Sequence, residues 1–426
     1  MNRWDRYWFA DGGRYAVAVL RVAIAASVLL SLWRLWGHRP LAAPEQIYRP
    51  VGVWMVLGEV PPPELLVDVL WALAWGGTAA MLLGLLSRAA TVVSFAAAVA
   101  LAALSFSGRL TWSHQYNVIF IAQLAMLGAR SGDALSLDAL IRRWRGRPPR
   151  DVPRGYQWSV RLVVLAVSMM FVGAALHKIG SGQFTLRWAL SDNLRHQLLV
   201  HYDINGIERP PLVDWLLAEP WRYRTAALGN LVSQLAPLLA IVYPGRPAMR
   251  AIAGVFFVLE VLGLGFVVSL WNLHWLPLAA VYVDWDRLIA WVARARMPAP
   301  APEVRPRRPV RGFVIAFVVY EVATSLIPTI DQRLNTYPFS SFPMFSSIRA
   351  ARPYDEHLPY AVAGDHYEAI ADRPIPPNVQ RWLDYANRRL HTVRDPEVLR
   401  ARLEAVLARA RARYPEAQIR GLRHEV

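Results

Sequence analysis

The sequence predicts an all-α polytopic membrane protein with about nine transmembrane helices and a small α+β extracytoplasmic tail at the C-terminal end. Of the 426 residues, 55% are hydrophobic and 18% are charged, whereas a soluble domain carries about a quarter charged residues. The apolar residues also form long blocks with almost no charge, such as 89–106 and 255–270. Uncharged apolar blocks of about 18 residues are typical of bilayer spans. Repeated many times in one chain, they exclude the core helices of a soluble protein.

Nine apolar segments follow one another along residues 1–330, which we expect to form the transmembrane domain. The first is long and lacks a small-residue cleavage site, so we expect it to stay as a signal anchor. The fourth and eighth are short, and we expect them to be tilted or partly re-entrant. The predicted spans are residues 15–32, 65–86, 89–106, 116–127, 160–176, 225–243, 252–270, 273–283 and 312–327.

The arginines in the short loops predict the orientation of these spans. Seven lie between Arg130 and Arg154 and six between Arg294 and Arg311, in loops on the same side as the N-terminus. Loops rich in Lys and Arg stay in the cytoplasm, so we expect a cytoplasmic N-terminus, a tail outside and a bacterial cytoplasmic membrane. The net charge of +16 is thus explained by membrane orientation, and no nucleic-acid partner is expected.

The external parts of the chain include an amphipathic stretch and the tail. Residues 186–200 are expected to lie at the membrane interface, and the Pro- and Arg-rich segment 298–309 is a linker before the last span. In the tail, residues 331–426, we predict strands at 360–362, 366–370 and 418–426 and helices at 378–390 and 396–413. Asp395 caps the second helix and Pro396 takes its first position.

Lysine occurs once in the chain, as Lys178, beside 46 arginines. An arginine stays charged, but a buried lysine can lose its proton and act as a base. Lys178 and His177 are at the outer end of the fifth predicted span. Two interpretations fit this position: a general base, or a side chain that extends its charge to the lipid headgroups.

Two further ionisable residues invite interpretation. His114 begins the fourth span at the same predicted depth as Lys178, which favours a shared site. Glu260 is in the middle of the seventh span, where an unpaired carboxylate is costly. We expect it to be protonated or paired with Arg21 or Arg161, with a structural pair favoured.

Other chemistry is disfavoured by the residues present. Asp133 and Asp138 are expected to cap a surface helix. The absence of cysteine excludes disulfides and thiol nucleophiles. His196 and His201 are five apart, which does not suit a zinc site, and no metal is expected. We find no phosphate loop, nucleophile elbow or dinucleotide fingerprint.

Three segments carry a family resemblance. They are the Trp-Ser-His-Gln-Tyr sequence at 112–116, the turn at 131–138 with its Ser-Leu-Asp, and the Val-Gly-Ala-Ala-Leu-His-Lys-Ile sequence at 172–179. In order and spacing they resemble the HTTM family, the membrane domain shared by vitamin K-dependent γ-glutamyl carboxylase and its bacterial relatives. The resemblance covers residues 10–330 approximately.

The resemblance implies a site and a reaction. Lys178 takes the place of the lysine that deprotonates vitamin K hydroquinone, and His114 that of a histidine near the quinol. Trp112, Tyr116 and His177 are then cofactor-binding residues. In the carboxylase, oxygen converts the quinol into a strong base that removes a γ-proton from a substrate glutamate, and carbon dioxide adds. The family has a pair of lysines here, and His177 takes the place of the first while Lys178 takes that of the second.

These observations leave more than one class of function open. The first is a quinol-dependent carboxylase or epoxidase, a lyase with Lys178 as base and a menaquinol-type vitamin K hydroquinone as cofactor. The second is a non-catalytic scaffold on the same fold that binds an extracytoplasmic protein or peptide. A transporter is disfavoured because most spans lack polar residues. Membrane lipid is a partner in each case.

Overall fold

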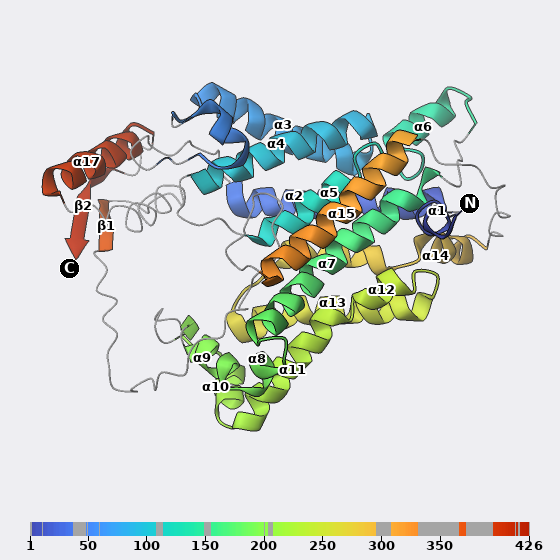
Figure 1. Ribbon diagram of the computed structural model, residues 1–426. Helices are drawn as coiled ribbons and strands as arrows, with labels where there is room; N and C mark the ends of the chain where they lie inside the picture. The colour runs from blue at the N-terminus through green and yellow to red at the C-terminus, as the bar shows by residue number, and fades with distance from the viewer. Residues whose placement is uncertain are drawn as a thin grey trace. The chain divides into compact units, whose positions relative to one another are not determined.

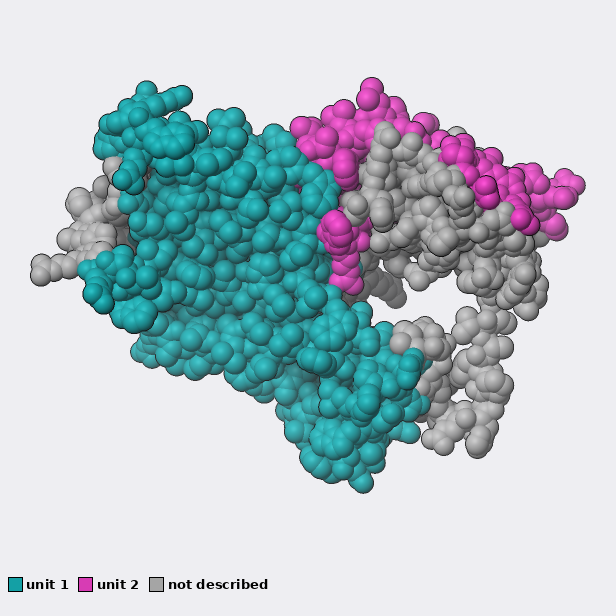
Figure 2. Space-filling view, turned by 180° about the vertical axis from the view of Figure 1, so that it is seen from behind, with its two compact units in different colours: residues 1–31, 75–95, 114–354 teal, residues 32–74, 96–113, 355–426 magenta. Residues whose placement is uncertain are grey.

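The computed structural model describes residues 2–10, 12–36, 48, 50–58, 60–107, 114–148, 155–199, 201–202, 208–294, 308–330, 366–371, 395–413, 415 and 418–425. The chain divides into two compact units, residues 1–31, 75–95 and 114–354 in one and residues 32–74, 96–113 and 355–426 in the other (Figure 2). Almost all of the described secondary structure is helical (Figure 1).

The helices, with η marking those of the 3-10 type, are α1 (Arg3–Trp8), α2 (Arg14–Trp36), η1 (Gly52–Leu57), α3 (Glu64–Leu83), α4 (Ser87–Ser107), η2 (His114–Tyr116), α5 (Asn117–Ala125), α6 (Leu137–Trp144), α7 (Gln157–Ser181), α8 (Arg187–Leu190), α9 (Asn193–Leu199), α10 (Pro211–Leu217), α11 (Pro220–Leu235), α12 (Leu238–Val242), α13 (Pro247–Val268), η5 (Leu273–Tyr282), α14 (Trp285–Val292), α15 (Arg308–Ile330) and α17 (Pro396–Arg413).

Seven of the predicted spans are helices long and apolar enough to cross a membrane: α2, α3, α4, α7, the pair α11 and α12, α13 and α15. Helix α15 shows why such helices suit a bilayer. It exposes a face of Ile315, Val319, Val322 and Leu326 and buries the face that carries Phe317. Because an exposed apolar face of this length is stable against lipid rather than water, the described chain has the helices of a multi-pass membrane protein.

Prolines explain where two spans depart from a regular α-helix. The sixth span is divided into α11 and α12, and Pro237 is the residue before α12. The eighth span is the 3-10 helix η5, with Pro277 in its interior. A proline donates no backbone hydrogen bond and its ring clashes with the preceding turn, so neither segment continues as one α-helix.

Contacts between neighbouring helices show which of them run parallel and which antiparallel. Helices α7 and α15 are parallel neighbours (Figure 1): the rings of Trp158 and Phe313 are 6.0 Å apart near their starts, and a Cβ at Gly173 would lie 3.6 Å from Ser325 Oγ near their ends. Segment η5 is antiparallel to α13, because Arg250 Nη2 near the start of α13 donates to the carbonyl of Val283, just after η5, at 2.7 Å.

The starts of several helices in the first unit gather at one end. Asp138 accepts hydrogen bonds from the Ser87 amide at the start of α4, and Tyr156, just before α7, donates to Asp133. Asp286 in α14 accepts from the amide of Tyr15 in α2. Segment α5 lies beside the first half of α4, since Gln123 Nε2 donates to Ser94 Oγ at 2.7 Å.

The second unit contains the described part of the tail. Strand β1 (His366–Ala371) pairs antiparallel with β2 (Ile419–Glu425). Asp395 Oδ1 accepts from the amides of Glu397 at 2.9 Å and Val398 at 3.3 Å, which confirms the predicted cap of α17. Both strands and this helix match their predicted ranges closely, whereas the predicted strand 360–362 and helix 378–390 lie outside the described residues.

We expect Gly265→Ala to destabilise the protein. A Cβ at this position in α13 would lie 2.6 Å from the ring of Trp271, so the tryptophan must move. Gly263→Ala is the matched control on the same helix, because a Cβ there meets nothing within 4 Å and alanine is the better helix former. Thermal unfolding in detergent checks this, and equal unfolding temperatures for both variants would contradict it.

Candidate functional site

The single lysine is buried between helices of the first unit. Lys178 is 2% exposed. Its Nζ donates hydrogen bonds to Asn230 Oδ1 at 2.5 Å and to Gln234 Oε1 at 3.0 Å. Asn230 and Gln234 are four residues apart on α11, so they lie on one helix face, and this face contacts Lys178 of α7. Helices α7 and α11 are neighbours (Figure 1).

The same two amides connect Lys178 to a buried carboxylate. Glu260 on α13 is 4% exposed, and its Oε1 accepts from Asn230 Nδ2 at 2.7 Å and from Gln234 Nε2 at 2.8 Å. Each amide therefore accepts from the amine and donates to the carboxylate.

The expectation that Glu260 pairs with Arg21 or Arg161 is wrong. Arg21 donates instead to the backbone carbonyls of Ser131 and Leu135. Arg161 lies over the ring of Tyr7, with its guanidinium carbon 4.3 Å from the ring centroid. Backbone carbonyls contact the guanidinium group of Arg21 and an aromatic face contacts that of Arg161, in place of the Glu260 carboxylate.

An aromatic ring covers the other side of the amine. Lys178 Nζ lies 4.5 Å from the centre of the Trp188 ring, within the range of a cation–π contact. Trp188 is on the short helix α8 and belongs to an apolar cluster with Ala175 of α7 and Leu231 of α11. The predicted interfacial stretch 186–200 thus forms α8 and α9, and α8 places a ring on the lysine.

A cavity of about 190 Å³ opens beside these groups. Its lining combines the polar network with a mostly apolar wall. The lining residues are Lys178, Trp188, Leu194, Gln197, Ala226, Asn230, Ser233, Leu259, Glu260, Gly263, Leu264, Val267 and Val268. A mostly apolar cavity with a few convergent polar groups is the usual form of a small-molecule site.

The predicted site residues His114, Tyr116 and His177 are not among the lining residues of this cavity. His114 and Tyr116 form η2, where Tyr116 stacks on His274 with ring centroids 5.2 Å apart. His177 is buried, and its Nδ1 has no hydrogen-bond partner in the described part of the chain. Trp112 lies outside the described residues.

The sequence reasoning missed Asn230, Gln234 and Trp188. A signal was present for the first two, because an asparagine and a glutamine four apart in an apolar span repeat at helical spacing. Trp188 gave no such signal, since its contact with Lys178 depends on how α8 folds back onto α7.

A surface contact holds the segment that carries Trp188. Asp192, between α8 and α9, accepts from Tyr223 OH at 2.7 Å and from Arg224 Nη2 at 2.8 Å, both on α11. These hydrogen bonds, first from Tyr223 and then from Arg224, lower the pKa of Asp192.

We expect Asp192→Asn to reduce thermal stability slightly at pH 7 and not in acid. A lowered pKa in the folded state stabilises the fold above the unfolded pKa of about 3.9, and this contribution is lost as the pH falls through the lowered pKa. The effect is small because the pair is exposed. Unfolding temperatures of both proteins between pH 7 and pH 3 test this, and a constant difference across that range would contradict it.

Comparison of the chain with protein-family models, with curated proteins and with solved structures finds no match.

Proposed function

We propose that this protein is a quinol-dependent membrane enzyme of the carboxylase or epoxidase type, with Lys178 as its general base. The observation that carries the proposal is a buried amine held by two amide oxygens at the wall of a mostly apolar cavity. The resemblance to the HTTM family supplies the quinol as substrate class. Vitamin K hydroquinone of the menaquinol type is the proposed cofactor.

The surroundings of Lys178 suit both protonation states of its amine. A neutral amine has two N–H bonds, which Asn230 and Gln234 occupy, and this leaves the lone pair to accept a proton. A protonated amine has a third N–H, which the ring face of Trp188 and the nearby charge of Glu260 stabilise. A general base must exist in both states during one turnover. We therefore propose Trp188 and Glu260, in place of His114, as the groups that assist Lys178.

The cavity also has room for one aromatic ring of a quinol. A dry apolar cavity of about 150 Å³ holds benzene, and this cavity measures about 190 Å³. Trp188, Leu194 and Leu259 would contact the ring. When bound, a hydroquinone supplies an acidic phenolic proton and an oxidisable ring. Lys178 Nζ would take up that proton and later release it to water.

We also propose nine crossings, a cytoplasmic N-terminus and an external tail in a bacterial cytoplasmic membrane. The parallel course of α7 and α15 supports the count, because an odd number of crossings must separate them. The pair α11–α12 and α13 supply two, and η5 is then the third. Likewise α4 and α7 start at the same end, so α5 is the crossing between them. The arginine-rich loops at that end favour the cytoplasm.

A structural role is the second candidate, as a scaffold or partner-binding protein. One observation favours it: four buried polar side chains form hydrogen bonds with one another across three helices, namely Lys178, Asn230, Gln234 and Glu260. These hydrogen bonds alone would hold α7, α11 and α13 together.

The test uses purified protein in nanodiscs with reduced vitamin K, oxygen and bicarbonate. We expect the wild-type protein to form quinone epoxide. Ser168→Ala is the control for variants of Lys178, because it changes another buried polar residue of α7. Ser168 contacts Tyr282 and does not line the cavity. If correctly folded wild-type protein forms no epoxide from several quinols, the enzyme proposal is overturned and the structural role stands.

A further inference from the structure

A second hollow, of about 540 Å³, lies where α3 ends and α4 begins, beside the loop before α6. Its lining is rich in arginine and contains two aspartates. The lining residues are Leu85, Leu86, Ser87, Arg88, Ala89, Arg130, Gly132, Asp133, Asp138, Ile141, Arg142, Arg145 and Arg147. With five arginines against two aspartates, the formal charge of the lining is positive by three.

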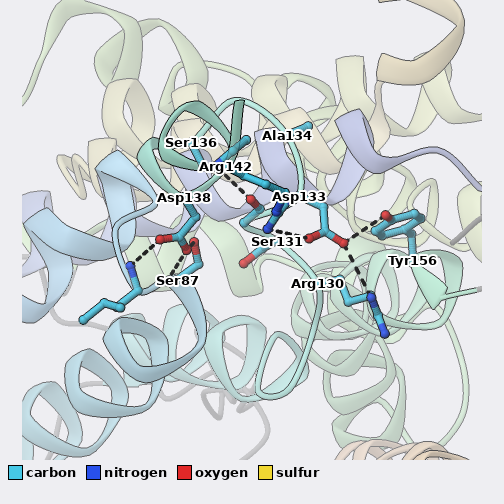
Figure 3. Close-up of polar contacts among 12 residues, drawn as sticks. Ser87, Arg130, Ser131, Asp133, Ala134, Ser136, Asp138, Arg142 and Tyr156 are labelled. Atoms are coloured by element: carbon cyan, nitrogen blue, oxygen red, sulfur yellow. Dashed lines mark hydrogen bonds and ion pairs between the residues drawn. The ribbon is translucent and has the colours of Figure 1, made fainter. Parts of the chain in front are cut away.

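Both aspartates already accept hydrogen bonds from other groups of the protein (Figure 3). Asp138 accepts from the amides of Leu86 and Ser87 and from Ser87 Oγ, all at 2.8 Å. It therefore caps α4 from 51 residues along the chain, and the expectation that it caps a surface helix is wrong. Ser136 caps α6 instead, since its Oγ accepts from the Ala139 amide at 3.0 Å.

Asp133 is shared among three partners. It accepts a hydrogen bond from Tyr156 at 3.0 Å and lies 3.8 Å from Arg130 Nη1 and 3.7 Å from Arg142 Nη2 (Figure 3). Because one carboxylate faces two guanidinium groups at these long distances, the positive charge of neither arginine is fully balanced.

One arginine of the lining keeps an unused hydrogen-bond donor, and three others lack a carboxylate partner in the described part of the chain. The Arg142 side chain is 14% exposed, and its Nη1 is buried without a hydrogen-bond partner in the part of the chain that the structure describes. Among the described residues, no ion pair joins Arg88, Arg145 or Arg147 to a carboxylate. The bias of cytoplasmic loops toward arginine explains charge near the membrane, but not a buried guanidinium donor left without an acceptor.

The backbone around the hollow is held in place before any ligand binds. Arg21 in α2 donates to the carbonyls of Ser131 and Leu135, each at 2.5 Å. Gly132 packs so closely that a Cβ would lie 2.4 Å from Ser87 Oγ. A hollow with a fixed wall costs little ordering entropy when an anion enters.

We propose that this hollow binds a phosphate group, carried by an anionic lipid headgroup or by a small soluble phosphate compound. The planar guanidinium fork matches phosphate oxygens with two parallel hydrogen bonds, and the free Nη1 of Arg142 supplies one such donor. The hollow adjoins the first turn of α4, a candidate span, which puts it at the level where lipid phosphates lie.

The test measures ligand-dependent thermal stability of the purified protein in nanodiscs. One arm compares discs of phosphatidylcholine with discs that contain phosphatidylglycerol. The other adds inorganic phosphate or glycerol phosphate to phosphatidylcholine discs. Stabilisation in the first arm assigns a lipid headgroup, and stabilisation only in the second assigns a soluble phosphate compound.

Variants of neighbouring arginines make the test specific. We expect Arg142→Gln to weaken binding roughly tenfold, as loss of one charged hydrogen bond would. Arg143→Gln removes the same charge from the same helix but does not line the hollow, so it should bind as the wild type does. If Arg142→Gln does not fold, the double change Arg145→Gln and Arg147→Gln replaces it. No stabilisation in either arm, or equal loss in the Arg143→Gln control, overturns the proposal.

Discussion

Lys178→Met is expected to reduce epoxide formation from vitamin K hydroquinone by at least about 100-fold, the typical contribution of a general base. Methionine nearly fills the volume of the lysine stem but cannot accept a proton. Lys178→Arg should be equally inactive, because a guanidinium stays protonated and has no lone pair to offer. Initial rates in nanodiscs, with each variant checked for folding, measure both effects.

The arginine variant separates a base from a fixed positive charge. If Lys178→Arg keeps wild-type turnover, the site needs a cation and the base assignment is wrong. Quinol binding, measured separately in the discs, should survive in Lys178→Met, since the apolar wall remains. Loss of binding with unchanged turnover of bound quinol would also contradict the assignment.

The spans could be predicted because a helix that crosses a bilayer needs a long run of apolar residues, which is visible in the sequence. Long uncharged apolar runs have few alternatives to a transmembrane helix, and α2, α4 and α13 begin within a few residues of the predictions. Neighbouring residues alone were enough to predict the start of α17, because Asp395 and Pro396 mark the start of the helix. The 3-10 form of η5 was not predicted, although Pro277 is visible in its sequence.

The contacts of the candidate site were less predictable than its central residue. Lys178 stood out by composition alone, as the single lysine among 46 arginines. Its partners depend on packing between helices that are distant in sequence: Asn230 and Gln234 on α11 and Glu260 on α13. The same reason applies to Asp138, whose partner Ser87 is 51 residues away. A pattern within one segment cannot show which other helix it will face.

Glu260→Leu is expected to destabilise the protein strongly, by about 3–5 kcal/mol, because removal of one partner leaves the other charge buried and uncompensated. The amides of Asn230 and Gln234 would also lose their shared acceptor. Glu321→Leu is the matched control. Glu321 is a second buried carboxyl in a span, and its Oε1 has no hydrogen-bond partner among the described residues, so its replacement should cost far less.

The double variant Lys178→Met and Glu260→Leu decides whether the two residues act as a pair. If the amides couple them, the double variant should be more stable than the sum of the single changes predicts, with a coupling of about 0.5–3 kcal/mol. Unfolding free energies in mixed micelles provide the four values required. Strict additivity of the two changes in unfolding free energy would show that the amides do not couple Glu260 to Lys178. Trp188 would then be the group left to stabilise the protonated amine, and Trp188→Leu should lower turnover more than Glu260→Gln does.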